Sequence, residues 1–371
     1  MRRHLFARLG ALVAVLAVLA AACSRGEETG GGGEQGGDQG QAEQSLLQTV
    51  QDRGTLNCGV NNTVPGFGFD PGTGEIDGFD IDFCRAIAAA VLGDPEAIEL
   101  VPVDAEERFN ALRAGEYDVL VRNTTWTSSR DGTEGVAFAH VNFYDGQAMM
   151  VRADSGYKAV EDMDGTDVCV TTGTTTELNL ADYAAQVGVD IGPVTFEENP
   201  QLQEAFISGR CDGWTSDRSQ LAGIKSAWPE SDGGPDALVI LDDVMSKEPL
   251  APGVVDGDSQ WYDVVDWVVN GLILAEELGV DSGNLDQQVS SPDNPQVAAL
   301  LGVPFEAETE TISVDSGLGI DNAFMQDVIG AVGNYGEIFD RHLGPDTPLG
   351  LERGINALWT DGGIQYAPPF R

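Results

Sequence analysis

One pattern of residues occurs twice in this chain, at an offset of 94 residues, and it constrains the fold more than any other feature of the sequence. Residues 111–119 (ALRAGEYDV) and 205–213 (AFISGRCDG) each predict a helix that ends at a glycine and is followed by a strand. Glu106 and Glu107 begin the first helix, and Pro200 suits the first turn of the second because that position needs no amide hydrogen. A doubled unit of this kind predicts two lobes of the same architecture.

The residues around each repeat predict that both lobes are α/β. Residues 56–60 and 167–171 resemble each other as strands, and apolar side chains at helical spacing predict a helix within 78–93. Strands that alternate with helices form parallel sheets, and ligands of open α/β sheets lie beyond the carboxyl ends of the strands. Two lobes whose strand ends share one cleft could hold a ligand and close on it through a hinge. The segments that follow the predicted strands are 61–67, 123–130, 172–176 and 216–218.

The charge of the chain excludes some partners. The 371 residues include 19 Lys and Arg and 61 Asp and Glu, which gives a formal net charge of −42 at pH 7. Binding to nucleic acid needs clustered Lys and Arg on one face, and the few basic residues here are spread through an acidic background. Anionic membrane surfaces are poor partners for the same reason. The apolar content of 42% is typical of a folded chain, and the length indicates about two domains.

The first 45 residues predict export and a tether. Arginines precede the apolar run 9–22, which is shorter than the roughly 20 apolar residues that span a bilayer, so residues 1–22 are interpreted as an export signal. Three alanines directly before Cys23 resemble a lipoprotein cleavage box, in which that cysteine is lipidated. Leu19 lies one position further from the cysteine than in the usual box, which leaves plain secretion open. Residues 23–45 are rich in Gly, Gln and Glu and predict a flexible tether.

The remaining four cysteines indicate disulfides. An even number of cysteines in an exported chain favours disulfide bonds, and four cysteines permit three pairings. We predict pairing within each half of the chain, Cys58 with Cys84 and Cys169 with Cys211, with buried free thiols as the alternative. No CxxC spacing occurs and the mature chain keeps two histidines, so no metal site is expected.

The segments after the predicted strands carry groups that match an α-amino acid. Arg130 presents a rigid fork of donors that can hold a carboxylate through two hydrogen bonds. The run 173–176 (GTTT) precedes a predicted helix at 177–185, where unpaired amide hydrogens and hydroxyls favour an anion. Asp217 could accept from an ammonium group. Each of these residues alone also suits a surface ion pair, a turn or a solvated acid, so only their convergence indicates a ligand.

Eight stretches spread over residues 46–371 together match one family of proteins. They are 56–60 (LNCGV), 78–86 (GFDIDFCRA), 122–131 (RNTTWTSSRD), 168–179 (VCVTTGTTTELN), 208–212 (SGRCD), 246–250 (SKEPL), 333–339 (GNYGEIF) and 358–369 (LWTDGGIQYAPP). On these stretches the chain resembles the periplasmic amino-acid-binding proteins of ABC uptake systems, solute-binding protein family 3, and most closely the general L-amino-acid-binding subtype.

The resemblance implies a type II periplasmic-binding-protein fold, in which two α/β lobes are joined by a hinge. Residues 46–148 and 249–371 would form lobe 1, and residues 149–248 lobe 2. The resemblance also implies an extracytoplasmic monomer that needs no cofactor, closes on L-amino acids of broad specificity and delivers them to ABC transporter permease subunits. The protein would reach the membrane only through the lipid at Cys23.

An enzyme on the same architecture is the main rival, because a few relatives are dehydratases. Catalysis needs a positioned acid or base, and the candidate loops contain no histidine. Metalloprotease, phosphate-loop and nucleophile-elbow motifs do not occur in the sequence. An amino-acid-sensing receptor component that uses the same lobes is a third possibility.

The resemblance further implies the residues that bind the ligand. The arginine at the position of Arg130 grips the α-carboxylate in the family, helped at the positions of Thr125 and Thr175. The aspartate at the position of Asp217 takes the α-ammonium, with Asn123 nearby. The complete predicted set is Arg130, Asp217, Thr125, Thr175, Asn123, Thr174, Asn61, Phe67 and Phe109.

Selectivity for the ligand's side chain is predicted from fewer residues. Asn61, Phe67 and Phe109 fall where relatives contact that side chain, and Trp126 is a further aromatic residue after a predicted strand. Relatives that prefer basic amino acids carry an acidic residue at the position of Asn61, so this neutral residue favours broad selectivity. Arg218 replaces the small residue expected after Asp217. It would favour acidic ligands if it faced the cleft and would have no role if it faced solvent.

Overall fold

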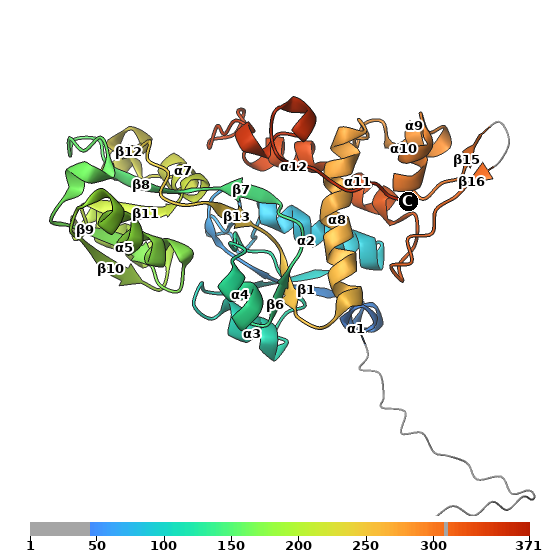
Figure 1. The fold of residues 1–371 in the computed structure, drawn as a ribbon, viewed down its shortest axis with the longest axis horizontal. Helices are drawn as coiled ribbons and strands as arrows, with labels where there is room; N and C mark the ends of the chain where they lie inside the picture. Colours follow the sequence, from blue (N-terminus) through green and yellow to red (C-terminus); the bar gives the residue numbers. More distant parts are fainter. Residues whose placement is uncertain (1–44, 308–310) are drawn as a thin grey trace, which may run out of the picture. The chain divides into compact units, whose positions relative to one another are not determined.

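The computed structural model describes residues 45–307 and 311–371, which belong to one unit of the chain (Figure 1). The predicted export signal, Cys23 and nearly all of the predicted tether lie outside the described residues. Ser45 is the N-cap of α1 (Leu46–Arg53), because its side chain accepts a hydrogen bond from the Leu47 amide. Among the described helices, none has the length and apolar character needed to cross a membrane.

The first lobe is built on a five-stranded sheet with the order β4-β1-β5-β14-β6. Strand β1 pairs in parallel with β4 and β5, whereas β14 comes from much later in the chain and pairs antiparallel to β5 and β6. The strands are β1 (Leu56–Val60), β4 (Ile98–Pro102), β5 (Val119–Leu120), β6 (Val136–Phe138) and β14 (Gly253–Val255). A short hairpin of β2 (Thr63–Val64) and β3 (Gly68–Phe69) follows β1.

Helices from both ends of the chain form the main core of this lobe. Helix α2 packs against α8, α11 and α12, so segments far apart in sequence lie side by side (Figure 1). Phe79 and Phe83 of α2 meet Tyr335 of α12, with ring centroids 6.1 and 6.5 Å apart. The elements of this lobe also include α2 (Phe79–Leu92), α3 (Arg108–Ala114), α4 (Ser128–Thr133), α8 (Ser259–Glu277), α9 (Leu285–Ser290), α10 (Pro295–Leu300), β15 (Phe305–Glu306), β16 (Thr311–Ile312), α11 (Phe324–Val332), α12 (Tyr335–His342), η4 (Gly354–Asn356) and η5 (Trp359–Asp361).

The second lobe repeats the plan of the first. Its sheet has the order β10-β9-β11-β8-β12, with β9 parallel to β10 and β11 and with β8 antiparallel to β11 and β12. The two sheets therefore correspond strand for strand, and the sequence repeat is also a structural repeat. The elements are β8 (Gln147–Arg152), η1 (Val160–Met163), β9 (Thr166–Thr171), α5 (Thr175–Val187), β10 (Ile191–Phe196), α6 (Asn199–Ile207), β11 (Gly213–Asp217), α7 (Arg218–Ser226), η2 (Glu230–Asp232), η3 (Pro235–Ala237) and β12 (Leu238–Ile240).

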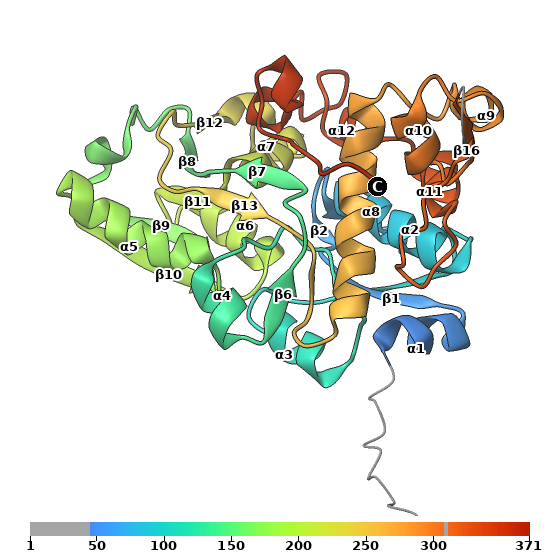
Figure 2. The ribbon, with the colours of Figure 1, turned by 45° about the vertical axis from the view of Figure 1, so that its right-hand side comes forward.

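Two crossings of the chain join the lobes. Strand β7 (Phe143–Asp145) leads into the second lobe, β13 (Glu248–Leu250) leads back, and the two strands pair antiparallel between the two sheets (Figure 2). This is the two-lobed α/β architecture that the sequence predicts. The lobe boundaries placed at 148/149 and 248/249 stay a prediction.

The helices lie where the sequence predicts them, but their ends differ from the predicted ends. Helix α2 confirms the helix predicted within 78–93. The helix predicted at 177–185 begins earlier, at Thr175, because the Thr174 hydroxyl accepts a hydrogen bond from the Glu177 amide and caps the helix there. Helix α6 carries a proline in its first turn, as predicted.

Two disulfides join neighbouring elements. Cys58 of β1 is bonded to Cys84 of α2, and Cys169 of β9 is bonded to Cys211, which lies just before β11. All four residues are buried. These are the two pairs that the sequence analysis selects from the three possible pairings.

Candidate functional site

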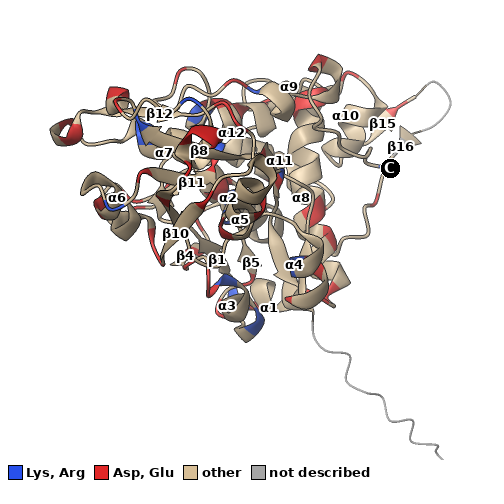
Figure 3. Ribbon diagram, turned by 60° about the vertical axis from the view of Figure 1, so that its left-hand side comes forward, with Lys and Arg blue, Asp and Glu red and all other residues tan. Residues whose placement is uncertain are grey.

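A cavity of about 300 Å³ lies where the strand ends of both lobes meet. The first lobe lines it with residues that follow β1, β4 and β5, and the second with residues at or after the ends of β9, β10 and β11. Basic residues are sparse along the ribbon (Figure 3), yet three arginines gather here. The structure brings these predicted residues to the cavity: Asn61, Asn123, Thr125, Arg130, Thr174, Thr175 and Asp217.

Two residues related by the sequence repeat face each other in the cavity. Asn123 follows β5 and Asp217 ends β11, 94 residues later, with the Asn123 Nδ2 3.5 Å from the Asp217 Oδ2. The same amide donates to the Gln220 Oε1 at 3.0 Å. The backbone of Asn123 has a φ of 26°, in the left-handed region that Asn tolerates well, and its amide donates to Asp80 at 2.9 Å. The repeat therefore brings one polar group from each lobe to the same point.

Arg130 lies on α4 and is largely buried at the cavity. Its Nη1 donates to the backbone oxygen of Thr125 at 2.8 Å, which fixes the guanidinium against the first lobe. Burial lowers the pKa of Arg130, and the negative charges of Glu248 and Asp217 oppose that effect. A fixed guanidinium in a buried position binds a carboxylate more strongly than one in water, because charge-assisted hydrogen bonds gain strength when solvent is excluded.

Thr125 and Thr175 meet from opposite lobes, with 3.3 Å between their Oγ1 atoms. Both hydroxyls donate to the Oε2 of Glu248, at 2.6 and 2.8 Å. Glu248 is 1% exposed and begins β13, so one carboxylate of a crossing strand positions a threonine of each lobe. Because their hydrogens point to Glu248, the hydroxyls cannot also donate to a ligand carboxylate. The unpaired backbone amides in the first turn of α5 can do so.

Asp217 is the buried acidic group of the cavity and is 5% exposed. Burial raises its pKa well above the usual value, and the charges of Asp145 and Glu248 raise it further. The hydrogen bond from Asn123 and the charge of Arg108 act in the opposite direction. A cation bound beside Asp217 would favour its ionised form in the same way.

Asn61 and Thr174 line the cavity and also hold its turns in place. The Asn61 Oδ1 accepts from the Thr63 amide at 2.9 Å, and its Nδ2 donates to the Asn123 Oδ1 at 3.3 Å. The Thr174 hydroxyl donates to the backbone oxygen of Thr171 at 2.6 Å while it caps α5. Both side chains therefore have structural partners in addition to the cavity surface.

Phe67 does not reach the cavity, contrary to the prediction. Its ring is 1% exposed and packs edge-on against Phe79 and Phe143, with centroids 5.8 and 5.3 Å away. An apolar ring next to the aromatic core of the first lobe gains more from burial there than from a polar cavity. Its assignment as a ligand contact stays a prediction, and its position in this structure does not support it.

Phe109 is not part of the cavity lining, whereas it was predicted to contact the ligand. The Cζ atoms of Arg108 and Arg130 lie 5.0 and 5.3 Å from the centroid of its ring, a cation–π distance. The ring therefore positions two guanidinium groups. Trp126 is 42% exposed and stacks on Phe138, outside the cavity lining.

The sequence leaves open whether Arg218 faces the cleft or the solvent, and in the structure its side chain bonds to backbone oxygens outside the cavity. Its Nη2 donates to the backbone oxygens of Leu241 and Asp243 at 2.8 and 3.1 Å. The residue is half-buried and is not part of the cavity lining. It fastens α7 to the segment that leads back to the first lobe, so it gives no basis for a preference for acidic ligands.

Two arginines that line the cavity were not predicted from the sequence. They are Arg108 and Arg122, which are 2% and 9% exposed. The Arg122 Nε donates to the backbone oxygen of Val103 at 2.7 Å, and the Arg108 Nη2 donates to that of Gly173 in the other lobe at 3.2 Å. Arg122 begins one of the stretches shared with the family, which was an available signal. Arg108 lies at the start of a short helix, where charged residues are ordinarily exposed.

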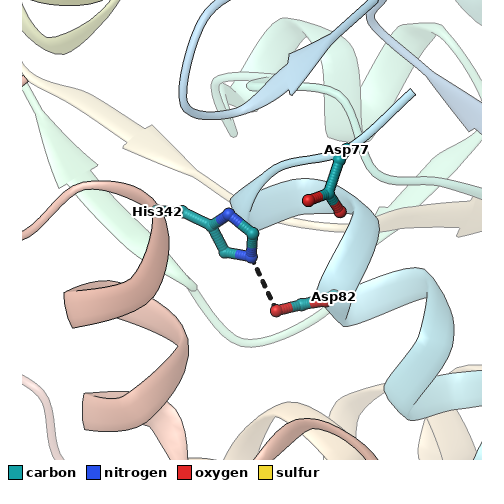
Figure 4. A group of neighbouring side chains, drawn as sticks. All are labelled: Asp77, Asp82 and His342. Atoms are coloured by element: carbon teal, nitrogen blue, oxygen red, sulfur yellow. Dashed lines mark hydrogen bonds and ion pairs between the residues drawn. The ribbon is translucent and has the colours of Figure 1, made fainter. Parts of the chain in front are cut away.

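Within the described residues, one group has the geometry of a metal site: Asp77, Asp82 and His342 (Figure 4). The His342 Nε2 lies 2.7 Å from the Asp82 Oδ2. Asp82 also pairs with the guanidinium groups of Arg85, at 2.8 Å, and Arg341. These partners satisfy the carboxylate without a metal ion, so the group is interpreted as a structural link between α2 and α12.

Comparison with known proteins supports the similarity over nearly the whole described chain. Residues 56–281 match the model of the bacterial extracellular solute-binding proteins, family 3. The chain is 46% identical over 330 residues to the general L-amino acid-binding periplasmic protein AapJ of Rhizobium johnstonii, which covers 89% of this chain and 94% of that protein. It is 43% identical over 332 residues to the glutamate/glutamine/aspartate/asparagine-binding protein BztA of Rhodobacter capsulatus, covering 90% of this chain and 95% of BztA.

A solved structure shares the complete two-lobed unit. It is an ABC transporter periplasmic binding protein from Brucella ovis with glutathione bound. The match has a TM-score of 0.82 at 43% sequence identity and covers 88% of this chain and 100% of the other.

Proposed function

This chain belongs to the bacterial extracellular solute-binding proteins, family 3, and we propose that it captures L-amino acids outside the cytoplasm and delivers them to the permease subunits of an ABC transporter. Its relatives support this proposal, since AapJ is named for general L-amino acid binding and BztA for four amino acids. Both relatives are named as binding proteins, and the proposal includes no catalytic step.

The observation that carries the proposal is that polar groups of both lobes line one cavity, so that each lobe could bind one half of an α-amino acid head. Arg130 of the first lobe would hold the α-carboxylate together with backbone amides at Thr175. Asp217 of the second lobe would accept from the α-ammonium, with the Asn123 side chain nearby. Every α-amino acid carries this head, so the site would accept many of them. Neutral Asn61 at the cavity surface supports that breadth.

Ligand binding would favour the closed arrangement of the lobes. A molecule held by Arg130 on one side and Asp217 on the other interacts fully only when both lobes are close together. Because a ligand shifts a conformational equilibrium by its difference in affinity for the two states, this bridging stabilises closure. The permease would then recognise the closed, loaded protein.

The location follows from the family and from the first residues of the sequence. We propose that residues 1–22 direct export, that Cys23 carries the lipid anchor, and that residues 23–45 form the tether of an extracytoplasmic monomer. The description of the family as extracellular supports the location.

The Arg130→Ala variant tests the assignment of the carboxylate site. A ligand present at 100 times its Kd stabilises the native state by about 2.7 kcal/mol, so the purified wild-type protein should melt at a higher temperature with many L-amino acids. Analogues lacking the carboxylate or the amine should give no shift. Arg130→Ala should lose the shift for every amino acid and keep its circular dichroism spectrum.

The matched control is Arg113→Ala. Arg113 lies on α3, outside the cavity, and pairs with Glu134 at 2.9 Å on the surface. This variant should keep every shift of the wild type. If Arg130→Ala still responds to L-amino acids like the wild type, the carboxylate is bound elsewhere and the site assignment fails.

A further inference from the structure

Arg108 is a buried cation whose hydrogen-bonding capacity is only partly used. It lines the cavity, is 2% exposed, and its Nε has no hydrogen-bond partner among the described residues. Its Nη2 makes a 3.2 Å bond to the Gly173 carbonyl, and its guanidinium lies over the Phe109 ring. A buried polar group without a partner costs free energy, so a ligand group that reached this guanidinium from the cavity would complete its hydrogen bonds.

The charges around Arg108 make an anion the most favourable partner. Burial lowers the pKa of Arg108 well below its usual range, and the positive charges of Arg130 and Arg122 lower it further. The acidic residues of the cavity lining other than Asp217 are exposed, namely Asp104, Glu197 and Glu198. Buried carboxylates act on all three guanidinium groups: Glu248 and Asp217 on Arg130, Asp80 on Arg122, and Asp217 on Arg108.

An α-amino acid head adds no anion for Arg108. Its carboxylate pairs with Arg130 and its ammonium with Asp217, so the head adds no net charge. Arg122 has acidic neighbours of its own, since Asp104 and Asp80 both act on it electrostatically. Arg108 interacts with Asp217, which the ligand's ammonium would also engage, so it is the guanidinium that has no carboxylate to itself.

We propose that Arg108 binds a second carboxylate on the ligand and so makes acidic ligands, such as L-glutamate and L-aspartate, the preferred members of a broad set. This inference rests on the proposed function, because it assumes that the α-amino acid head occupies Arg130 and Asp217. A γ-glutamyl peptide such as glutathione carries the same groups, an α-amino acid head and a second carboxylate, at a greater separation. The shared chemistry is therefore a dicarboxylate with one ammonium group.

The first test compares ligands of nearly equal shape on the wild-type protein. Isothermal titration calorimetry should give a Kd for L-glutamate about tenfold or more below that for L-glutamine, because hydrogen bonds to charged groups contribute more than neutral ones. L-leucine should bind more weakly than both. Reduced glutathione is the fourth ligand, and its Kd relative to that of L-glutamate identifies which separation of the carboxylates fits the cavity.

The second test uses Arg108→Met, which keeps the length of the side chain and removes its charge and donors. The ratio of the glutamate Kd to the leucine Kd should rise about 10- to 100-fold, as expected for the loss of one charge-assisted pair. Arg108→Lys should restore part of the preference. The control is Arg152→Met, which removes a guanidinium that also bonds backbone carbonyls and lies over a phenylalanine ring, but outside the cavity. That variant should keep the wild-type ratio.

The outcomes distinguish a failure of this inference from a failure of the proposed function. If the wild type binds no amino acid at all, the proposed function fails. If the wild type binds glutamate, glutamine and leucine equally, or if Arg108→Met weakens glutamate and leucine by the same factor, amino-acid binding stands and the role of Arg108 is overturned. Should Arg108→Met fail to fold, the wild-type comparison and Arg108→Lys still decide the question.

Discussion

Asp80 illustrates how burial of a single carboxyl group supports the site. The residue is 2% exposed on α2, and its Oδ2 accepts from the Asn123 amide at 2.9 Å. This bond holds the left-handed turn that points the Asn123 side chain toward the second lobe. Burial raises the pKa of Asp80 to about 7, an effect only partly opposed by the Asn123 bond and by the charge of Arg122.

Asp80→Asn should change the pH dependence of stability. The folded-state pKa of about 7 lies above the unfolded value near 3.9, so the folded chain keeps a proton that the unfolded chain has lost, and stability falls as the pH rises from about 4 to about 7. Asn cannot ionise and can still accept the Asn123 bond. The variant should therefore gain stability relative to the wild type as the pH rises from 5 to 8, by roughly 3 kcal/mol at most.

Urea unfolding at pH 5 and at pH 8, without ligand, measures the difference in unfolding free energy between Asp80→Asn and the wild type. Asp154→Asn, at an exposed position, is the control and should follow the wild type. The pH dependence of wild-type stability does not by itself identify Asp80, because burial also raises the pKa of Asp145 to about 6. An unchanged stability difference between Asp80→Asn and the wild type across this range would contradict the prediction.

Residues of the cavity were predictable where a side chain that suits an amino acid head also lies near the end of a predicted strand. Arg130, Asp217 and Thr175 follow strands and carry groups that suit an amino acid head, and the structure brings them to one cavity. Phe67 was expected at the cavity and lies outside its lining, because its position after a strand does not show which way the ring points. Arg108 was missed since burial of a charged helix residue depends on the packing of the other lobe, which no local pattern reveals.

At the scale of elements, each lobe carries one disulfide that joins parts distant in sequence. Cys58 and Cys84 tie β1 to the helix that covers it, with a sequence separation of 26, and Cys169 and Cys211 tie β9 to the start of β11, with a separation of 42. Crosslinks of this kind restrict the unfolded chain, and the restriction grows with the length of the loop that they close.

Removal of either disulfide should therefore destabilise the protein. The double variant Cys169→Ala/Cys211→Ala should lose roughly 4 kcal/mol of unfolding free energy in the chain-entropy estimate for a loop of this length. Cys58→Ala/Cys84→Ala should lose slightly less because its loop is shorter. Urea unfolding with and without a reducing agent measures both effects. Reductant should destabilise the wild type more than either variant, and equal unfolding midpoints for all three proteins would refute the prediction.

Helices and strands were predictable where a short stretch of sequence carries their pattern. The glycine-stopped helices and the strands that follow them were visible as a repeat, and α2 was visible from its apolar spacing. The pairing of β14 with β5 and β6 was not, because it joins segments more than 100 residues apart through a few backbone bonds. The short crossing strands β7 and β13 carry no pattern that distinguishes them from loops.

At the scale of the whole molecule, few direct bonds connect the lobes across the cavity. They include Asn199 to Thr63 at 3.1 Å, Arg108 to Gly173 at 3.2 Å and Asn123 to Gln220 at 3.0 Å. Most such bonds between neutral groups contribute about 0.5–1.5 kcal/mol each. Because these bonds are few and individually weak, we expect that a ligand can control the balance between open and closed arrangements.

L-glutamate should therefore shift this balance toward closure. A ligand bound to Arg130 and Asp217 adds hydrogen bonds with charged groups on both sides of the cavity, worth about 1.5–3 kcal/mol each, and every 1.4 kcal/mol of differential binding changes the ratio of closed to open molecules about tenfold. Small-angle X-ray scattering should show a smaller radius of gyration for the saturated protein. Arg130→Ala at the same ligand concentration should scatter like the ligand-free wild type, since it cannot bridge the lobes, whereas Arg113→Ala should close. If the wild type scatters identically with and without glutamate while calorimetry shows that it is saturated, the ligand binds without moving the lobes, and closure cannot be the signal that the permease recognises.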